Sequence, residues 1–382
     1  MSDNNKNCST RPFTWLIKHC ILTPLHQPLP KPTLTGGACT TFSSLPDDIL
    51  LEILSRAPLS SLPSLSLVSR RFAHLLGSPL LLHLRRLHRL LKPTVLAFSS
   101  HALRLDHDSS WSSTDIPFHL CALVLHARVV AIGRKVFILG QESTAEFDSW
   151  TRSVRLKPGM ISPRRKFAAA AVNGKIYVAG GSARVDSVEE YDVEKGEWRM
   201  VSHAPRKRYG CVGVGVEGMF FVIGGLKIGS CGSGVLSRAA VVGAEAVAYA
   251  SSMDVYDVEV RCWLRSRGVP GGGCVVAACG ANGCVYVLTS HAVELSFWRF
   301  RPRRRGEEEW CRMKGPPVEG PAGWGRLDGT VRFGCVGVED KVVLIQVKEC
   351  LVHVFDCNGN EWSRGAVLPE VVLRAACVCV EC

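Results

Sequence analysis

Cysteine and histidine are the residue types in this chain best suited to metal binding or redox chemistry. Cys379 and Cys382 form a C-x-x-C pair at the C-terminal end. A structural zinc site needs about four ligands, and neither a second such pair nor a histidine cluster accompanies this one. The twelve histidines form no H-x-H or H-x-x-x-H pair, and the closest two in the β-rich part are His101 and His107. The sequence therefore predicts no metal site.

Motifs for nucleophilic or nucleotide chemistry are also missing from the sequence. There is no G-x-S-x-G elbow, no P-loop and no dinucleotide-binding glycine fingerprint set between a strand and a helix. We expect no catalytic residues and no cofactor, so any function must come from binding surfaces. The elements that would position such surfaces are a short helical segment and a long β-rich repeat.

The composition is that of a globular protein with enough apolar residues for more than one core. Of the 382 residues, 47% are hydrophobic, and this length allows two or three domains. The longest apolar runs, at 120–125 and 175–179, are far shorter than the roughly 20 residues of a membrane-spanning helix. The apolar patch at 13–17 is too short for a secretion signal. The sequence therefore predicts a cytoplasmic or nuclear location, or both.

Cysteine usage and charge both favour an ordinary intracellular protein. Seventeen cysteines spread over a chain of this size indicate reduced thiols, and Cys211, Cys274 and Cys335 stand where small hydrophobic residues would. The net charge of +12 is dispersed. Its one dense run, 299–305, precedes three glutamates at 307–309, which favours a solvated loop over a nuclear-import signal or a patch for an acidic partner. We expect no membrane partner and no nucleic-acid partner.

Residues 1–42 are predicted to form a disordered tail, because they are rich in Asn, Ser, Thr and Pro and lack sustained periodicity. A transit peptide stays open as an alternative, since the tail is poor in acidic residues. Helical periodicity begins at 43–44. Ser44 is predicted to cap a helix with Asp47 and Asp48 favourably placed against its dipole.

Two further helices are expected after the first one. The second is amphipathic and covers 65–76, and the third covers 79–92, with leucines on one face and basic residues elsewhere. Residues 86–93 are expected to be a helical connector to the β-rich part, and the whole helix 79–92 would set the geometry between the two domains. Apolar residues on more than one side of the first helix indicate that it has more than one partner.

The helical segment carries a specific motif, L-P-D-D-I-L-L-E-I-L-S-R from Leu45 followed by L-V-S-R-R-F ending at Phe72. These residues resemble the F-box motif over 43–85. In that family the motif packs onto a Skp-type linker protein, which joins it to the cullin and RING subunits of an SCF-type ubiquitin ligase. The resemblance implies that the motif core or the linker contact is formed by Leu45, Pro46, Ile49, Leu50, Ile53, Leu54, Val68 and Phe72. The same residues would also hold together a small helical bundle with no partner.

From residue 94 onward the pattern changes to short β-rich runs separated by glycine and charged turns. The clearest unit, 165–201, divides into four strands. Asn173-Gly174 fits a tight hairpin turn between its first two strands, because both central residues of that turn type adopt positive φ. Other units are centred near residues 137, 222, 287 and 344. Repetition of this kind indicates stacked units.

A seven-residue interval separates an aromatic residue of the third strand from the tryptophan that opens the fourth. Together with two glycine doublets, these pairs resemble kelch repeats, which form the blades of β-propellers. The residues that carry the resemblance are Gly180, Gly181, Tyr191, Trp198, Gly224, Gly225, Tyr256, Trp263, Phe355 and Trp362. The interval is also kept from Phe147 to Val154, but the doublet is lost at 140–141, 289–290 and 346–347. Glycines and tryptophans are expected to be structural, within the blade cores.

The predicted fold is a small all-α F-box domain followed by an all-β six-bladed kelch β-propeller closed by the C-terminal strand. Closure removes exposed sheet edges. The repeats are expected at about 94–118 joined with 371–382, and at 119–160, 161–205, 206–270, 271–318 and 328–370. Insertions at 225–253 and around 301–309 are expected to project as loops, which serve either as binding loops or as disordered spacers.

The two resemblances imply a non-catalytic substrate adaptor of an SCF-type ubiquitin ligase. Its F-box would bind the Skp-type linker, and its propeller would bind a target protein that the sequence does not identify. The alternative is a kelch scaffold or cytoskeletal interaction protein outside any ligase, since the propeller fold alone does not determine function.

Overall fold

The computed structural model describes residues 42–98, 102–105, 110–114, 127–227, 246–291, 294–302, 309–318, 333–347, 349–369 and 376–382. The predicted tail therefore lies outside the described residues, apart from Phe42. Contacts divide the chain into two compact units, 1–46 and 47–382. No helix within the described ranges is long and apolar enough to cross a membrane.

The helical segment is built from short elements. They are η1 (Phe42–Ser44), α2 (Asp47–Ser55), η2 (Leu59–Ser61), α3 (Leu62–Val68), α4 (Arg70–Gly77) and α5 (Pro79–Leu87). The first helix begins at Asp47 and not directly after Ser44, which instead ends the 3-10 turn η1. A single helix over 65–76 is also wrong. Ser69 adopts an extended backbone and its side chain accepts a hydrogen bond from the Phe72 N–H, so it ends α3 and caps α4.

The third helix ends at Leu87, five residues before the predicted end, so the connector is not helical throughout. Arg89 has φ of 53°, and its N–H donates to the Arg86 carbonyl at 2.9 Å while the Leu90 N–H donates to the Arg85 carbonyl at 3.0 Å. This pair of bonds is a Schellman C-cap. Such a cap usually has glycine at the position of Arg89. Because arginine stands there instead, the sequence contains no glycine that marks the end of the helix.

The strands form six antiparallel sheets arranged as blades, and one two-stranded sheet. Blade 1 contains β27 (Ala376–Glu381), β1 (Pro93–Phe98), β2 (Ala102–Leu105) and β3 (Trp111–Thr114), and blade 2 contains β4 (Arg128–Ile132), β5 (Lys135–Leu139), β6 (Thr144–Asp148) and β7 (Val154–Lys157). Blade 3 contains β8 (Ala168–Val172), β9 (Lys175–Ala179), β10 (Ser187–Asp192) and β11 (Glu197–His203). Blade 4 contains β13 (Val212–Val216), β14 (Met219–Ile223), β16 (Ser252–Asp257), β17 (Cys262–Trp263) and β18 (Arg267–Gly268).

Blade 5 contains β19 (Cys274–Ala281), β20 (Cys284–His291), β21 (Glu294–Arg301) and β22 (Glu309–Met313), and blade 6 contains β23 (Phe333–Val338), β24 (Lys341–Gln346), β25 (Leu351–Asp356) and β26 (Glu361–Arg364). Strands β12 (Arg208–Tyr209) and β15 (Leu226–Lys227) pair with each other beside the short helix η3 (Ala246–Tyr249). The basic run expected to be a loop is in part a strand, because β21 extends to Arg301. Residues 303–308 lie outside the described residues.

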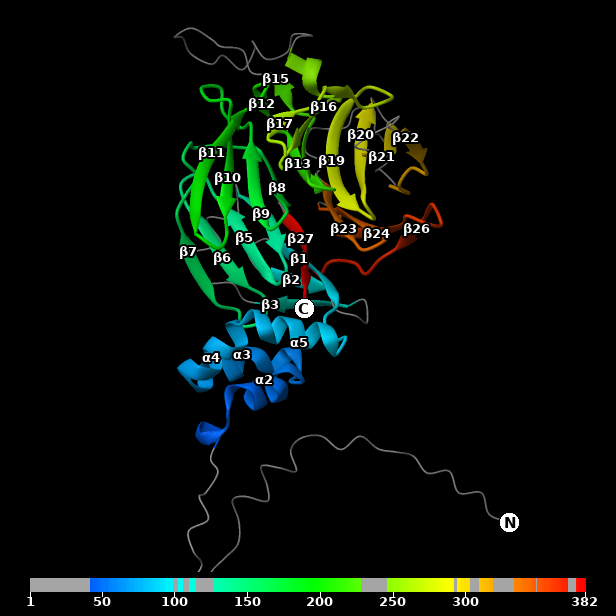
Figure 1. Cartoon of the computed structure of the whole chain (residues 1–382). Coiled ribbons are helices and arrows are strands. Elements are labelled where there is room, and N and C mark those ends of the chain that lie inside the picture. The colour runs from blue at the N-terminus through cyan, green and yellow to red at the C-terminus, as the bar shows by residue number, and fades with distance from the viewer. Residues whose placement is uncertain are drawn as a thin grey trace, which may run out of the picture. The chain divides into compact units, whose positions relative to one another are not determined.

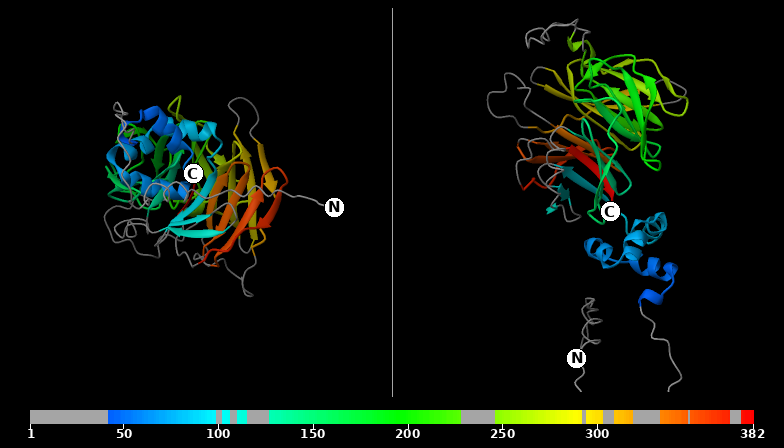
Figure 2. Two further views of the ribbon diagram at one scale, coloured as in Figure 1. Left: turned by 90° about the horizontal axis from the view of Figure 1, so that it is seen from below. Right: turned by 90° about the vertical axis from the view of Figure 1, so that its left-hand side faces the viewer.

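The predicted closure by the C-terminal strand is confirmed. β27 pairs with β1 along its whole length, from Pro93 opposite Glu381 to Phe98 opposite Ala376, and Figures 1 and 2 show the red end of the chain beside the cyan strands of blade 1. The backbone of Cys382 exchanges two further hydrogen bonds with Lys92, at 2.6 and 2.9 Å. Blade 1 is thus built from both ends of the β-rich part.

The turns between strands fit the sequence expectation for the clearest unit. Asn173 and Gly174 have φ of 49° and 75°, as the tight hairpin turn requires. Apolar cores lie between neighbouring blades: Tyr177 of blade 3, for example, packs with Phe220 and Tyr256 of blade 4. Each blade is therefore stabilised mainly by the next one around the ring.

The innermost strands approach one another very closely. They are β27, β4, β8, β13, β19 and β23, and each contacts the next around the ring. A Cβ atom added to Gly215 on β13 would overlap the carbonyl oxygen of Ala171 on β8, and one added to Gly280 on β19 would lie 2.7 Å from Cγ2 of Val216. Glycine and alanine therefore allow the ring to close.

We predict that Gly215→Ala destabilises the protein by about 1–3 kcal/mol, the usual cost of overpacking a filled interior. Gly268→Ala is the matched control, because a Cβ there meets nothing within 4 Å and its φ is not in the left-handed region. Urea unfolding of the purified full chain measures both. Equal free energies of unfolding for the two variants would contradict the close approach of β8 and β13.

Candidate partner-binding surfaces

Helix α2 separates the predicted F-box-like residues into two sets. Leu50 and Leu54 are buried, with 1% and 3% of their surface exposed, and they pack inside the helical segment. Ile49 and Ile53 point elsewhere and keep 46% and 47% of their surface exposed. Only the second set is available to a partner, so the predicted linker-binding residues serve two different purposes.

The end of α3 presents a second exposed apolar pair. Val68, a predicted residue, is 63% exposed, and its neighbour Leu67, which sequence reasoning missed, is 86% exposed. The signal for Leu67 was present, since it opens the L-V-S-R-R-F sequence. Phe72 on α4 is half-buried. Leu45 and Pro46 belong to the other compact unit, and their contact with a linker stays a prediction.

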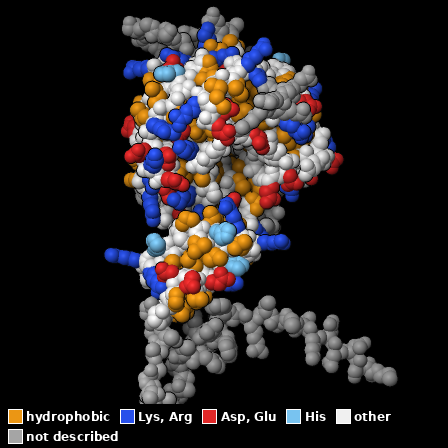
Figure 3. Space-filling view, in the orientation of Figure 1, with side chains coloured by type: hydrophobic (Ala, Val, Ile, Leu, Met, Phe, Trp, Pro, Cys, Tyr) orange, Lys and Arg blue, Asp and Glu red, His pale blue; other side chains and the backbone are white. Residues whose placement is uncertain are grey.

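An ion pair joins the start of α4 to the first turn of α2. Nη2 of Arg71 lies 2.6 Å from Oδ1 of Asp47, and Nε donates to the same oxygen at 2.7 Å. The start of α4, directly after Val68, is thereby held beside the first turn of α2. We call Ile49, Ile53, Leu67 and Val68 the linker face. Figure 3 shows apolar side chains exposed on the helical segment next to acidic ones.

Helix α5 is anchored on both of its sides by one buried arginine. Nη1 of Arg85 donates to the carbonyls of Ser55 and Ala57, at 3.1 and 2.8 Å, and so satisfies the C-terminal end of α2. The same guanidinium lies 5.1 Å from the ring centroid of Trp150, a fully buried residue between β6 and β7. Arg85 thus ties the helical segment to blade 2.

Further contacts join the helical segment to the propeller. Arg134, in the β4–β5 turn, lies 4.4 Å from the Trp150 ring and donates through Nη1 to the Leu76 carbonyl at 2.7 Å. Arg86 pairs with Glu381, whose carbonyl accepts a hydrogen bond from Trp150 Nε1 at 3.2 Å. These contacts support the hypothesis that the segment before β1 sets the geometry between helices and propeller.

The kelch-like aromatic residues pair directly across strands three and four. Ring centroids lie 5.0 Å apart for Tyr191 and Trp198. The same arrangement recurs at 5.2 Å for Tyr256 and Trp263 and at 5.0 Å for Phe355 and Trp362. The three indole N–H groups donate to the preceding blade or the chain after it, at Pro158 O, Ser202 Oγ and Lys314 O. The tryptophans therefore hold adjacent blades together.

A further aromatic pair of this kind was missed from the sequence. Phe300 and Trp310 lie opposite each other on β21 and β22 with centroids 4.9 Å apart. The interval between them is longer than seven residues because the insertion at 303–308 falls inside it. The two aromatic residues flanking the charged run were the available signal.

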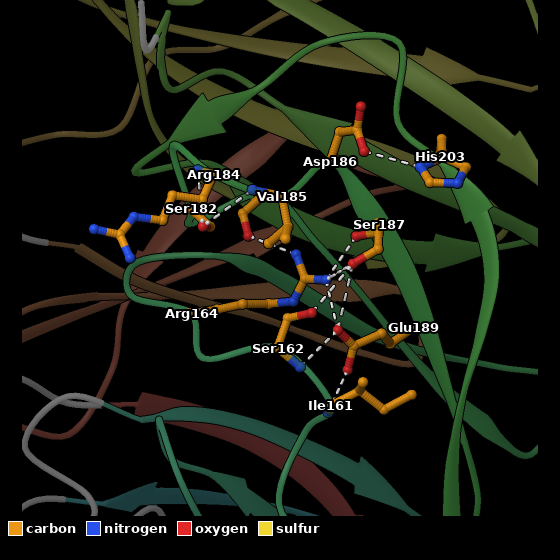
Figure 4. Close-up of polar contacts among 11 residues, drawn as sticks. Ile161, Ser162, Arg164, Ser182, Arg184, Val185, Asp186, Ser187, Glu189 and His203 are labelled. Carbon is orange, nitrogen blue, oxygen red and sulfur yellow. Dashed lines mark hydrogen bonds and ion pairs between the residues drawn. The ribbon is translucent and has the colours of Figure 1, made fainter. Parts of the chain in front are cut away.

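Buried arginines hold the glycine doublets, and sequence reasoning missed them too. The side chain of Arg164 is fully buried and donates to the carbonyl of Gly180 at 2.9 Å, to both oxygens of Ser187 at 2.7 Å and to Oε1 of Glu189 at 2.7 Å. The other oxygen of Glu189 accepts from the Ile161 N–H at 2.8 Å. Figure 4 shows these groups converging on the Arg164 guanidinium.

Blade 4 repeats the arrangement with Arg208. This side chain donates to the carbonyl of Gly224 at 2.8 Å, to Oγ of Ser252 at 3.0 Å and to Oδ2 of Asp254 at 2.9 Å. Burial lowers the pKa of Arg208, and the adjacent Asp254 carboxylate opposes that shift. Each arginine precedes its doublet by sixteen residues. That spacing was a signal in the sequence. Blade 5 lacks both parts of it: Thr289 replaces the first glycine of the doublet, and Gly273 stands where the arginine would be, sixteen residues earlier.

The comparisons with known proteins agree with this architecture. The F-box domain family matches residues 42–84 and the Kelch motif matches residues 163–204. The chain is 47% identical over 99% of its length to the whole of F-box/kelch-repeat protein At5g26960 of Arabidopsis thaliana. F-box/kelch-repeat protein At2g22030 of the same plant is 31% identical over 48% of this chain and 53% of its own. The solved structure of YjhT, at 14% identity, covers 64% of this chain and 84% of its own with a TM-score of 0.50.

The chain belongs to the F-box/kelch-repeat family. The F-box match covers α2, α3, α4 and most of α5, and the Kelch match covers blade 3 with its Arg164 network. The YjhT likeness concerns the fold alone. Members of this family generally act as substrate adaptors of SCF-type ubiquitin ligases and are generally non-catalytic.

The cysteines of this F-box/kelch-repeat protein occupy varied environments. Cys211 is fully buried, as expected for a small hydrophobe, but Cys335 is half-buried and Cys274 is exposed at the start of β19, which corrects the prediction for it. Burial raises the pKa of Cys379 to about 11 and also raises that of Cys382. Among the described residues no group of three or more His, Cys, Asp or Glu could hold a metal ion.

We predict that Arg164→Lys destabilises the kelch propeller by about 2–4 kcal/mol, because one ammonium cannot replace the planar fork and leaves buried acceptors unpaired. The adjacent Arg165→Lys is the control. Arg165 is exposed, so its replacement should change the free energy of unfolding by less than about 0.5 kcal/mol. Thermal and urea unfolding measure both variants, and similar values for the two would refute the structural role of Arg164.

Proposed function

We propose that this protein is the substrate-recognition adaptor of an SCF-type E3 ubiquitin ligase. The observation that carries the proposal is the linker face: an F-box sequence in which four apolar side chains stay exposed although the segment has a complete core of its own. Exposed apolar side chains that gather in a patch mark protein–protein interaction sites. A Skp-type linker protein is the partner that the F-box match supports, and cullin and RING subunits follow through it.

The propeller binds the target protein, and the adaptor carries out no bond chemistry. Its mechanism is proximity, because holding the target near an activated ubiquitin raises the target's effective concentration there. The contacts of α5 with Trp150 and Glu381, and that of α4 with Arg134, favour a fixed relation between the two binding surfaces. The adaptor would act in the cytoplasm, the nucleus or both.

The two ends of the propeller are suited to different roles: one end contacts the helical segment and the other is available to a target. Arg134 and Trp150 lie in turns at the end where the innermost strands finish, which we call the hairpin end. The glycine doublets, β15 and η3 lie at the opposite end, where the innermost strands begin, which we call the doublet end. The helical segment uses the hairpin end, so the doublet end is the better candidate for target binding. The insertion at 225–253 starts there, whereas β21 ends and β22 begins at the hairpin end.

We predict that Ile53→Asp lowers the affinity for a Skp-type linker at least tenfold, because a charge replaces an apolar contact in a desolvated interface. Leu156→Asp is the matched control: Leu156 is 69% exposed on β7 of the propeller. Pull-down and calorimetric titration of the purified full chain with a plant Skp-type protein measure the effect, and circular dichroism checks that both variants fold.

Two outcomes of that experiment count against the ligase proposal. Wild-type protein that fails to bind the linker, while a known F-box protein binds under the same conditions, would favour the alternative of a kelch scaffold outside any ligase. Equal loss of binding in Ile53→Asp and Leu156→Asp would show that the linker face is not the contact surface.

A further inference from the structure

Three chain segments form one continuous surface at the doublet end of blades 3 and 4. The Arg165 N–H donates to the Gly181 carbonyl at 3.0 Å, the Gly181 N–H to the Arg208 carbonyl at 2.8 Å, and the Gly210 N–H to the Lys166 carbonyl at 2.9 Å. The segments are 164–166, 180–186 and 206–210. The buried guanidinium groups of Arg164 and Arg208 donate hydrogen bonds to the Gly180 and Gly224 carbonyls on the interior side of this surface, which makes the surface rigid.

The surface carries an excess of positive charge. Its cations are Arg165, Lys166 and Arg184, which are exposed, and Lys207, which is half-buried. Within the part of the chain that the structure describes none of the four forms an ion pair. The guanidinium of Arg184 points away from the Arg164 network in Figure 4. We call these four residues the basic rim.

Two of the three acidic groups that the structure describes beneath and beside the rim are neutralised by buried arginines, and the third has a hydrogen-bond partner. Glu189 and Asp254 are buried against Arg164 and Arg208. Asp186 pairs with His203 at 2.8 Å, and this hydrogen bond lowers the pKa of the Asp186 carboxyl. Of these three groups, Asp186 is thus the one carboxylate beside the rim, and Lys207 also acts on it electrostatically. The four cations of the rim therefore leave an excess of positive charge that favours an anionic partner.

An apolar hollow adjoins the basic rim. It has a volume of about 230 Å³ and is lined by Lys166, Tyr209, Gly210, Gly225, Leu226, Ala250, Cys274 and Val275. Nζ of Lys166 lies 5.4 Å from the Tyr209 ring centroid, which places a cation at the edge of the hollow. A Cβ on Gly225 would lie 3.0 Å from the Tyr209 carbonyl oxygen. The absence of a side chain at Gly225 therefore lets the two segments pack closely at the wall of the hollow.

We propose that this site binds an acidic peptide segment of the target, with one aliphatic side chain in the hollow and flanking carboxylates on the basic rim. The proposal rests on the proposed function, since it names the class of target that the propeller captures. Apolar walls suit an amino-acid side chain better than a phosphodiester backbone, which argues for a peptide over a nucleic acid. The chain's own N-terminal tail does not fit, because residues 1–41 contain a single acidic residue, Asp3.

Fluorescence anisotropy with the purified full chain tests the site directly. The probe is a fluorescein-labelled dodecapeptide with one central leucine flanked on each side by Glu-Glu, in a Gly-Ser background. Lys166→Glu should weaken its binding about tenfold, because one attractive contact becomes repulsive. Arg261→Glu is the matched control, since Arg261 is exposed in the β16–β17 turn at the opposite end of blade 4, and it should leave the affinity unchanged.

A second variant tests the hollow separately from the charge. Cys274→Trp should fill the hollow, and a peptide with glycine in place of leucine should then bind as well as the leucine peptide. In the wild-type protein the leucine peptide should bind more tightly than the glycine peptide. If the two peptides bind the wild type equally, the hollow does not receive a side chain and the proposal is wrong.

Two other results would overturn the proposal. One is equal affinity of Lys166→Glu and Arg261→Glu for the acidic peptide. The other is tighter binding of a twelve-nucleotide oligo(dT) than of the peptide, with the same dependence on Lys166, which would assign the rim to nucleic acid. Linker binding is measured on the same protein preparation, so failure of the peptide site is distinguishable from failure of the ligase adaptor function.

Discussion

The fit of six innermost strands around one axis is the constraint on which the rest of the structure depends. Neighbouring strands approach until Gly215 and Gly280 leave no room for a Cβ, and the ring closes only because β27 supplies the innermost strand of blade 1. Closure also fixes the C-terminal residue beside Lys92. The last residues of the propeller thereby become part of the surface on which α5 rests, since Glu381 contacts both Arg86 and Trp150.

The same constraint explains where the buried charges stand. A glycine doublet turns the chain sharply after the second strand and leaves carbonyl groups without strand partners. Arg164 and Arg208 satisfy those carbonyls and are themselves neutralised by Glu189 and Asp254. Burying an ion pair costs desolvation free energy, but here each guanidinium gains several acceptors in a fixed geometry. The result is two rigid loop clusters at the doublet end, in the blades whose doublets are intact.

Periodic features of this fold could be predicted from the sequence, and features made by single long-range contacts could not. The aromatic interval of Tyr191 and Trp198 recurs, so it revealed the blades. The closure followed from an unpaired apolar strand after the last unit and an N-terminal fragment that lacked its first strand. The end of α5 depends on a left-handed Arg89, for which the sequence gives no glycine signal. The F-box-like motif pointed to three of the four residues of the proposed linker face and missed Leu67, and only the packing shows that Leu50 and Leu54 are internal while Ile49 and Ile53 are exposed. The sixteen-residue spacing between a buried arginine and a glycine doublet occurs only at Arg164 and Arg208. Two instances do not make a recognisable repeat, so the contacts were needed to identify it.

The arrangement of the two ends gives the adaptor proposal a geometric meaning. A ligase adaptor must hold its target at a defined distance from the catalytic subunits, and a flexible joint would spread that distance over a wide range. In this chain the joint is only residues 88–92, and Arg85 before it and Arg134 after it both pack against the Trp150 ring. Whatever binds at the doublet end is therefore separated from the linker face by one rigid propeller. The height of the propeller, and not the length of a linker, would determine where the target is presented.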